Sequence, residues 1–137
     1  MLNKGRPEEE LFTFLAEKKS EDLDHAYILS SMCTLPHAVA VRAHCMFMET
    51  NLGDPGLFPG TMALEQILVR RFGDLFHCPS AGGYATSGGT ESNIQALRLA
   101  RVQNSSIKKP NIIVPDSAHF SFRKACDILC LEMRRVP

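Results

Sequence analysis

Two stretches near the start of the chain place apolar side chains at helical spacing. Residues 8–19 open with three glutamates, which suit the positive end of a helix dipole, and continue with a cluster of Leu11, Phe12, Phe14 and Leu15. Residues 36–49 carry an apolar stripe made of Ala38, Val41, Cys45 and Met48. We expect this second helix to begin at Pro36, because proline suits the first helical position. Both segments are predicted to be helices with an apolar side that needs a partner.

A loop rich in glycine and proline precedes a third predicted helix. Residues 51–60 hold too many breakers of regular structure to form a helix or a strand. Thr61 is expected to cap the helix that follows. Apolar side chains recur behind it at helical spacing, at Leu64, Ile67, Leu68, Phe72 and Leu75.

From Gly82 onward, short segments typical of strands alternate with helical ones, the last of them, residues 131–136, with only a weak alternation of apolar and polar side chains. Strands are predicted at residues 83–86, 111–115 and 131–136. The helix predicted after Thr90 is mostly apolar and is expected to be well covered. The helix predicted after His119 should turn four side chains inward, namely Phe122, Ala125, Cys126 and Leu129.

This alternation indicates an α/β fold with a mostly parallel sheet and right-handed crossovers. We predict a helical N-terminal region over residues 1–81. Residues 82–137 are predicted to form the first part of an α/β domain, with an incomplete sheet and flanking helices.

The most informative motif is TSGGTESN, at residues 86–93. Its two glycines allow a tight turn and a close approach of the backbone to a ligand. At the start of the helix that follows, free N–H groups point outward at the positive end of the helix dipole. This arrangement suits the binding of a phosphate group. The motif is not a nucleotide P-loop, because no Gly-Lys-Ser/Thr closes it. A glycine-rich turn with Thr90 as the N-cap remains open as the alternative.

Three segments together carry a family resemblance: residues 49–60 (ETNLGDPGLFPG), the TSGGTESN motif and residues 116–125 (DSAHFSFRKA). In this order they resemble the cofactor-binding half of pyridoxal-phosphate-dependent amino-acid decarboxylases of fold type I, group II. The resemblance is greatest to the archaeal L-tyrosine/L-aspartate decarboxylases and runs from about Ser31 onward. Sphingosine-phosphate lyases share the same general layout.

The resemblance implies a role for each matching residue. Gly89 and Thr90 would hold the phosphate of pyridoxal 5'-phosphate, with Gly88 shaping the turn. His119 would stack on the pyridine ring as a catalytic residue; its alternative is a histidine satisfied at a helix start. Leu57 and Phe58 match a region that lines the substrate pocket, although a rigid loop anchor explains them equally well.

The family also uses an active-site lysine after a histidine and an aspartate at the pyridine nitrogen, both far downstream. No lysine in this chain follows a histidine, and Lys124 stands where the family has a basic helix residue. We therefore expect the front part of a decarboxylase for aspartate or tyrosine, giving β-alanine or tyramine, ended early and inactive alone. Two alternatives stay open. One is a truncated remnant that binds phosphate weakly or pairs with a full-length subunit, and the other is a lyase of the sphingosine-phosphate type.

The composition of the chain excludes several classes of binding partner. Fifteen basic and fifteen acidic residues leave no net charge, so neither a nucleic acid nor an anionic membrane is an expected partner. The polar N-terminus does not resemble a signal peptide, and no apolar run is long enough to span a membrane. The five cysteines include no Cys-x-x-Cys motif. His37 and His44 are seven residues apart, but no carboxylate stands at metal-ligand spacing from them, so no metal site is expected. We expect a cytoplasmic protein, homodimeric in its full-length form, with an amino acid as substrate.

Overall fold

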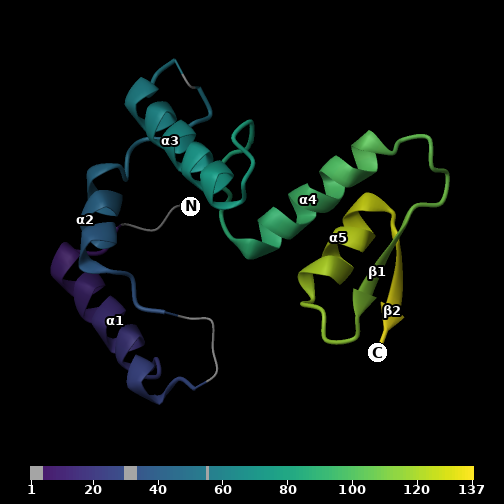
Figure 1. Ribbon diagram of the computed structural model, residues 1–137. Helices are drawn as coiled ribbons and strands as arrows, with labels where there is room; N and C mark the ends of the chain where they lie inside the picture. Colours follow the sequence, from purple (N-terminus) through teal and green to yellow (C-terminus); the bar gives the residue numbers. More distant parts are fainter. Residues whose placement is uncertain (1–4, 30–33, 55) are drawn as a thin grey trace. The chain divides into compact units, whose positions relative to one another are not determined.

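The computed structural model describes residues 5–29, 34–54 and 56–137, so Cys33 and Pro55 lie outside the described residues. The chain divides into two compact units, Met1–Thr50 and Asn51–Pro137 (Figure 1). The predicted domain boundary near Gly82 stays a prediction.

The described residues of the first unit form two helices and a short 3-10 turn: α1 (Glu8–Ser20), η1 (His25–Tyr27) and α2 (Ala38–Met46). The helix expected over residues 8–19 is confirmed, with glutamates in its first turn and lysines in its last turn. The predicted start of α2 at Pro36 is wrong, because the helix begins at Ala38. His37 caps it instead, with its Nδ1 atom accepting the Val39 N–H at 3.2 Å.

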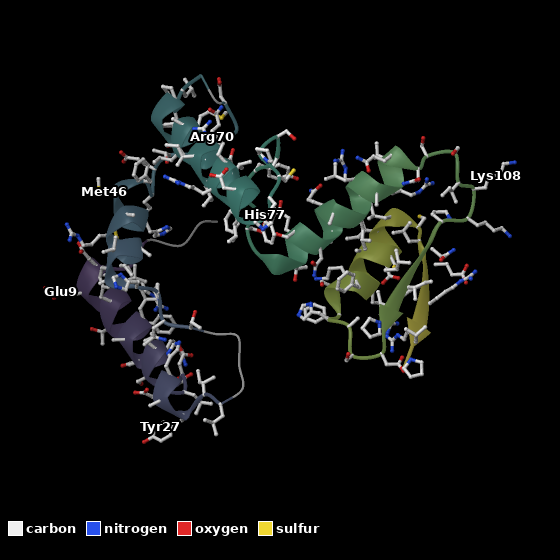
Figure 2. All side chains as sticks on the ribbon, in the orientation of Figure 1. Glu9, Tyr27, Met46, Arg70, His77 and Lys108 are labelled. Atoms are coloured by element: carbon white, nitrogen blue, oxygen red, sulfur yellow. The ribbon has the colours of Figure 1, made fainter. Side chains whose placement is uncertain are left out.

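The first unit buries none of its described residues in α1 or α2. Large side chains project from it as sticks in Figure 2, among them Tyr27 at 77% exposure and Met46 at 74%. The apolar sides that the sequence predicts for these helices therefore face no cover within the described part of the chain.

The second unit begins with α3 (Pro59–Leu75). The prediction that Thr61 caps this helix is wrong: Pro59 occupies the first turn, and Thr61 lies inside the helix. Proline is suited to that place because the N–H it lacks would have no intrahelical partner there. Beyond the C-cap residue Phe76, His77 is left-handed (φ 56°), which lets the Cys78 N–H donate to the Gly73 carbonyl at 2.8 Å.

The strand predicted at residues 83–86 is wrong, because this segment is irregular in the structure. Its backbone pairs with a side chain: the Ala85 N–H donates to Glu65 Oε1 of α3 at 2.9 Å. A strand needs a neighbour to pair with, and the two strands of the described residues pair with each other.

The remaining elements form a β–α–β unit next to α4 (Gly89–Gln103): β1 (Asn111–Pro115), α5 (Ser121–Leu129) and β2 (Glu132–Val136) (Figure 1). The two strands are parallel, in a register that pairs Asn111 with Glu132 and Pro115 with Val136. The strands predicted at 111–115 and 131–136 are confirmed to within one residue. Cys130 ends α5 in the left-handed conformation (φ 54°), and β2 starts two residues later.

The core of this unit lies around α5, which contacts both α4 and β2. It consists of Val114, Ala125, Cys126 and the hydroxyl-bearing Ser121. Phe122 and Leu129 are half-buried on the same helix, so the predicted inward side of α5 is confirmed. The expectation that α4 is well covered is wrong: α4 buries no residue, and Leu99 and Val102 are 55% and 60% exposed. Among the described helices α4 packs on α5, which leaves its other sides open.

Candidate functional site

The start of α4 presents free backbone donors to open space. The first backbone bond of the helix runs from the Ser92 N–H to the Gly88 carbonyl at 3.0 Å. In the part of the chain that the structure describes, the N–H groups of Gly89 and Thr90 donate to no acceptor. A Cβ atom built on Gly88 or Gly89 meets nothing within 4 Å. Free donors, a helix dipole and open space together suit a small anion.

The cap of α4 differs from the simplest sequence interpretation. Gly88 occupies the N-cap position, where no side chain caps the helix, with an almost fully extended backbone (φ 159°, ψ 178°). The proposed N-cap role of Thr90 is therefore wrong, because Thr90 lies in the first turn of the helix. Its hydroxyl is left available to a ligand at the same helix end.

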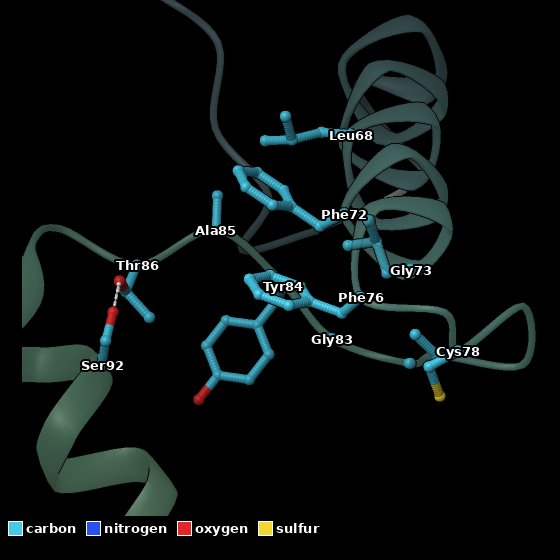
Figure 3. A pocket seen from close by; sticks show the side chains of 13 residues that line it. Leu68, Phe72, Gly73, Phe76, Cys78, Gly83, Tyr84, Ala85, Thr86 and Ser92 are labelled. Atoms are coloured by element: carbon cyan, nitrogen blue, oxygen red, sulfur yellow. Dashed lines mark hydrogen bonds between the residues drawn. The ribbon is translucent and has the colours of Figure 1, made fainter.

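Glu91 closes the loop that precedes α4. Its Oε2 atom accepts from the Ser87 backbone N–H at 2.7 Å and from the Ser87 hydroxyl at 2.6 Å. The Ser87 hydroxyl, and then its N–H, hold the pKa of Glu91 below its usual value. A carboxylate that reaches back in this way resembles the glutamate half of a capping box. Thr86 and Ser92 add a second tie, with 2.6 Å between their hydroxyl oxygens (Figure 3).

A chain of hydrogen bonds joins α4 to His119. The Asn93 amide, one turn after the glycines, donates to Ser121 Oγ at 2.8 Å. Ser121 Oγ lies 2.9 Å from His119 Nδ1, and the Ser121 N–H donates to the same nitrogen at 3.3 Å. His119 itself is exposed, while Ser121 is fully buried. The structure thus links the glycine turn with His119, two motifs that the sequence could place only in order.

His119 also lies beside an aromatic ring. The His119 and Phe120 ring centroids are 4.2 Å apart with a 38° tilt between the planes. With Phe120 near one face, a flat ligand would have to stack on the other face. The sequence did not single out Ser121, although its spacing of two from His119 was a signal that a short side-chain bond could form.

The position of His119 follows from the sheet. In parallel strands the carboxyl ends meet at one edge, where α/β proteins hold their ligands. β1 and β2 end together at this edge, where the Asp116 N–H donates to the Val136 carbonyl at 2.8 Å. A cavity of about 180 Å³ opens there, lined by His119, Phe120, Arg123, Arg135 and five neighbours.

A larger apolar cavity of about 460 Å³ lies between the second half of α3 and the loop before α4. The side chains of Leu68, Phe72 and Tyr84 line its apolar part, and Thr86 and Ser92 line its end toward α4 (Figure 3). Leu57 and Phe58 line neither cavity. Leu57 is 68% exposed, and Phe58 stands at the N-cap of α3, so the structure does not bring them to His119.

Among the described residues, no group of three metal-ligating side chains comes together. The four described cysteines, Cys45, Cys78, Cys126 and Cys130, are free thiols. Burial raises the pKa of the Cys126 thiol, with a smaller contribution from Asp127. No helix in the described ranges is both long enough and apolar enough to cross a membrane.

Comparison with known proteins gives relatives that match the chain from end to end. A probable L-tyrosine/L-aspartate decarboxylase of Methanosphaerula palustris is 67% identical over all 137 residues, which are 38% of its length. A protein of the same description from Methanoregula boonei is 71% identical over the whole chain and 37% of its own length. A probable L-aspartate decarboxylase of Archaeoglobus fulgidus is 54% identical over 85% of the chain. No protein-family model matches the chain.

Among solved structures, a Lactobacillus brevis glutamate decarboxylase superposes on the whole chain with a TM-score of 0.73. It is 22% identical, and the match covers 34% of that protein. The chain therefore has the fold of part of such a decarboxylase, and the predicted fold class is confirmed. It spans a little more than a third of the length of the curated relatives that it matches, and its resemblance to the tyrosine/aspartate decarboxylase family is confirmed.

Proposed function

We propose that this chain is a portion of a pyridoxal-phosphate-dependent amino-acid decarboxylase that acts on L-aspartate or L-tyrosine. The observation that carries the proposal is the open start of α4, joined through Asn93 and Ser121 to His119. The names of the relatives support the reaction class and the two substrates. The reaction replaces the α-carboxylate by a proton and releases CO₂, giving β-alanine or tyramine.

The residues present fit the phosphate of the cofactor. Gly88 and Gly89 leave room for an anion, and the N–H groups of Gly89 and Thr90 are free to donate to it. The Thr90 hydroxyl would add a third donor. The carboxylate of Glu91 would repel an anion at this site, but two hydrogen bonds hold it against Ser87. This arrangement keeps the helix start electropositive without a lysine.

When bound, pyridoxal 5'-phosphate accepts the electron pair that remains on the α-carbon after CO₂ leaves. The chain's part is to bind and to orient. His119 would lie flat against the pyridine ring on the face away from Phe120 and fix its plane. Leu57 and Phe58 would approach the substrate side chain in the complete enzyme, which we propose to be a cytoplasmic homodimer.

The alternatives are less well supported. A lyase of the sphingosine-phosphate type would share the cofactor turn, yet the relatives named above are all described as decarboxylases. A non-catalytic remnant remains the rival for the chain by itself, because none of its lysines stands in the family's histidine–lysine context.

The test is a titration of the purified protein with pyridoxal 5'-phosphate, followed by absorption and by competition with inorganic phosphate. Thr90→Ala should weaken binding about 10- to 100-fold, since a hydrogen bond to a charged group contributes about 1.5–3 kcal/mol. Thr61→Ala is the matched control, because Thr61 is also half-buried in the first turn of a helix. Equal affinities of the two variants would reject the phosphate site.

Borohydride treatment separates the enzyme from the remnant. We expect no reduced adduct on any lysine of this chain, and CO₂ release from aspartate or tyrosine only by a protein that also carries the family's lysine. A stable adduct that maps to one lysine, such as Lys124, would contradict this assignment.

A further inference from the structure

Ser121 is the one polar side chain that is fully buried among the described residues. A buried hydroxyl without partners costs free energy, so its hydrogen bonds are specified by the fold. Both of its side-chain partners come from the candidate site: Asn93 on α4 and His119 before α5. The sequence separation between Asn93 and Ser121 is 28 residues, so the contact depends on the packing of α4 against α5.

Donor and acceptor chemistry fixes the direction of each bond. The Asn93 Nδ2 group can only donate, so the Ser121 oxygen accepts there. The hydroxyl has a single proton, which then points to His119 Nδ1 at 2.9 Å. The Ser121 backbone N–H, also a donor, faces the same nitrogen at 3.3 Å. His119 Nδ1 therefore receives two donors and must be an acceptor.

We propose that Asn93 and Ser121 are positioning residues that lock His119 in the tautomer with its proton on Nε2. The locked ring presents an N–H donor on its free side and keeps its plane, with Phe120 close to one face. The meaning of this lock for decarboxylation rests on the proposed function, whereas the lock itself rests only on the three hydrogen bonds.

The lock explains why residue 93 is an amide. An aspartate has the same shape but only accepts hydrogen bonds. It would take the proton of the Ser121 hydroxyl, and the hydroxyl oxygen would then need a donor. His119 Nδ1–H is the group in place to supply one, at the expense of the longer bond from the Ser121 backbone N–H at 3.3 Å. Asn93→Asp should therefore reverse the tautomer.

The experiment is long-range ¹H–¹⁵N NMR of the ¹⁵N-histidine-labelled protein at about pH 8, where an ordinary histidine is neutral. His119→Gln identifies the signals of His119 among those of the five histidines. We expect wild-type His119 in a single Nε2–H tautomer, with Nδ1 shifted as a hydrogen-bonded acceptor. Ser121→Ala should move the Nδ1 signal toward its unbonded position, and Asn93→Asp should place the proton on Nδ1. Ser117→Ala, an exposed serine in the same turn, should change neither nitrogen.

The outcomes separate this inference from the proposed function. An Nδ1–H tautomer in the wild type, or an Asn93→Asp protein that keeps the wild-type tautomer, overturns the inference. The wild-type spectrum decides the matter even if a variant fails to fold. The NMR experiment is done without cofactor, so the two hypotheses can fail separately. If His119 is locked but the protein binds no pyridoxal 5'-phosphate, the inference holds and the proposed function is rejected. If the protein binds the cofactor but His119 is not locked, the proposed function holds and the inference is rejected.

Discussion

The β1–α5–β2 unit and the N-terminal helices α1 and α2 are built from similar apolar residues, yet only the former has a core. Val114, Ala125 and Cys126 are 7% or less exposed in the β–α–β unit. In α1, by contrast, Phe12 and Leu15 are 60% and 47% exposed. The difference shows that amphipathic patterning makes a helix, whereas burial requires a second surface within reach of the chain.

The two regions also differ in their relation to the candidate site. His119, Ser121 and the start of α4 are held by contacts within the second unit. The exposed apolar side chains of α1 and α2 imply that these helices gain stability from surfaces other than their own. The second subunit of the homodimer that we propose for the complete enzyme would supply such a surface.

A buried charge gives the sharpest test of this comparison. Ala125→Asp in α5 places a carboxylate at a position with 0% exposure and should cost about 3–5 kcal/mol of unfolding free energy. Ala43→Asp in the exposed α2 is the matched change and should cost less than about 1 kcal/mol. Urea unfolding followed by circular dichroism measures both. Similar losses for the two variants would mean that the regions do not differ as described.

Two glycines of α3 extend the comparison to one helix. A Cβ on Gly73 would lie 2.7 Å from the Cys78 carbonyl oxygen and 3.1 Å from Ala81 Cβ, so Gly73→Ala should destabilise the protein by about 1–3 kcal/mol. Gly60→Ala meets nothing within 4 Å and should stabilise it by about 0.5–1 kcal/mol. Thermal unfolding of the pair should move in opposite directions, and a shift in the same direction would contradict the tight turn at Gly73.

The end of α5 offers a gain of stability inside the packed unit. Cys130 is left-handed at φ 54°, a conformation that costs a side chain about 1–2 kcal/mol. Cys130→Gly should therefore raise the free energy of unfolding by about 1 kcal/mol, partly offset by the entropy of glycine. Cys130→Ala removes the thiol but keeps the strain, so it should bring no such gain in the same denaturation experiment.

The smallest expected effect concerns the loop before α4. Ser87→Ala should raise the pKa of Glu91 toward its usual value, because the hydroxyl is the main cause of the low pKa. A carboxyl with a lowered folded pKa stabilises the protein above about pH 4.3, and this contribution is lost as the pH falls through the folded value. Carboxyl ¹³C NMR titration measures the shift. Ser117→Ala should leave the Glu91 titration unchanged, and a wild-type titration at the usual value would refute the bond to Ser87.

The sequence predicted the elements whose cause is local. The apolar positions of α5 recur within nine residues. β1 is a short apolar run before it, and β2 is a weakly alternating segment after it. The sequence-based prediction failed where two nearby residues could each begin or cap the same helix. Pro36 was predicted as a first helical residue and Thr61 as a cap, but the His37 side chain and Pro59 define the helix starts.

Long-range pairing explains the other differences. Residues 83–86 have the composition of a strand, but Ala85 bonds to Glu65, twenty residues away, instead of to a strand. The hydrogen bonds from Asn93 through Ser121 to His119 could not be predicted from the sequence either, because hydrophobic periodicity does not indicate which helices contact one another. The order of the motifs predicted the residues of the site; only packing shows how they are tied together.

The parallel register of β1 and β2 has a consequence for biosynthesis. The segment that connects β1 to β2 is little longer than α5 itself, so the whole unit is contiguous in sequence. Pairing over a short stretch of chain costs less loop-closure entropy than pairing over a long one, and chains leave the ribosome from the N-terminus onward. The β–α–β unit can thus form as soon as Val136 has emerged. Nascent α1 and α2 reach the solvent earlier with their apolar sides bare, so they depend longest on chaperones or on a later partner.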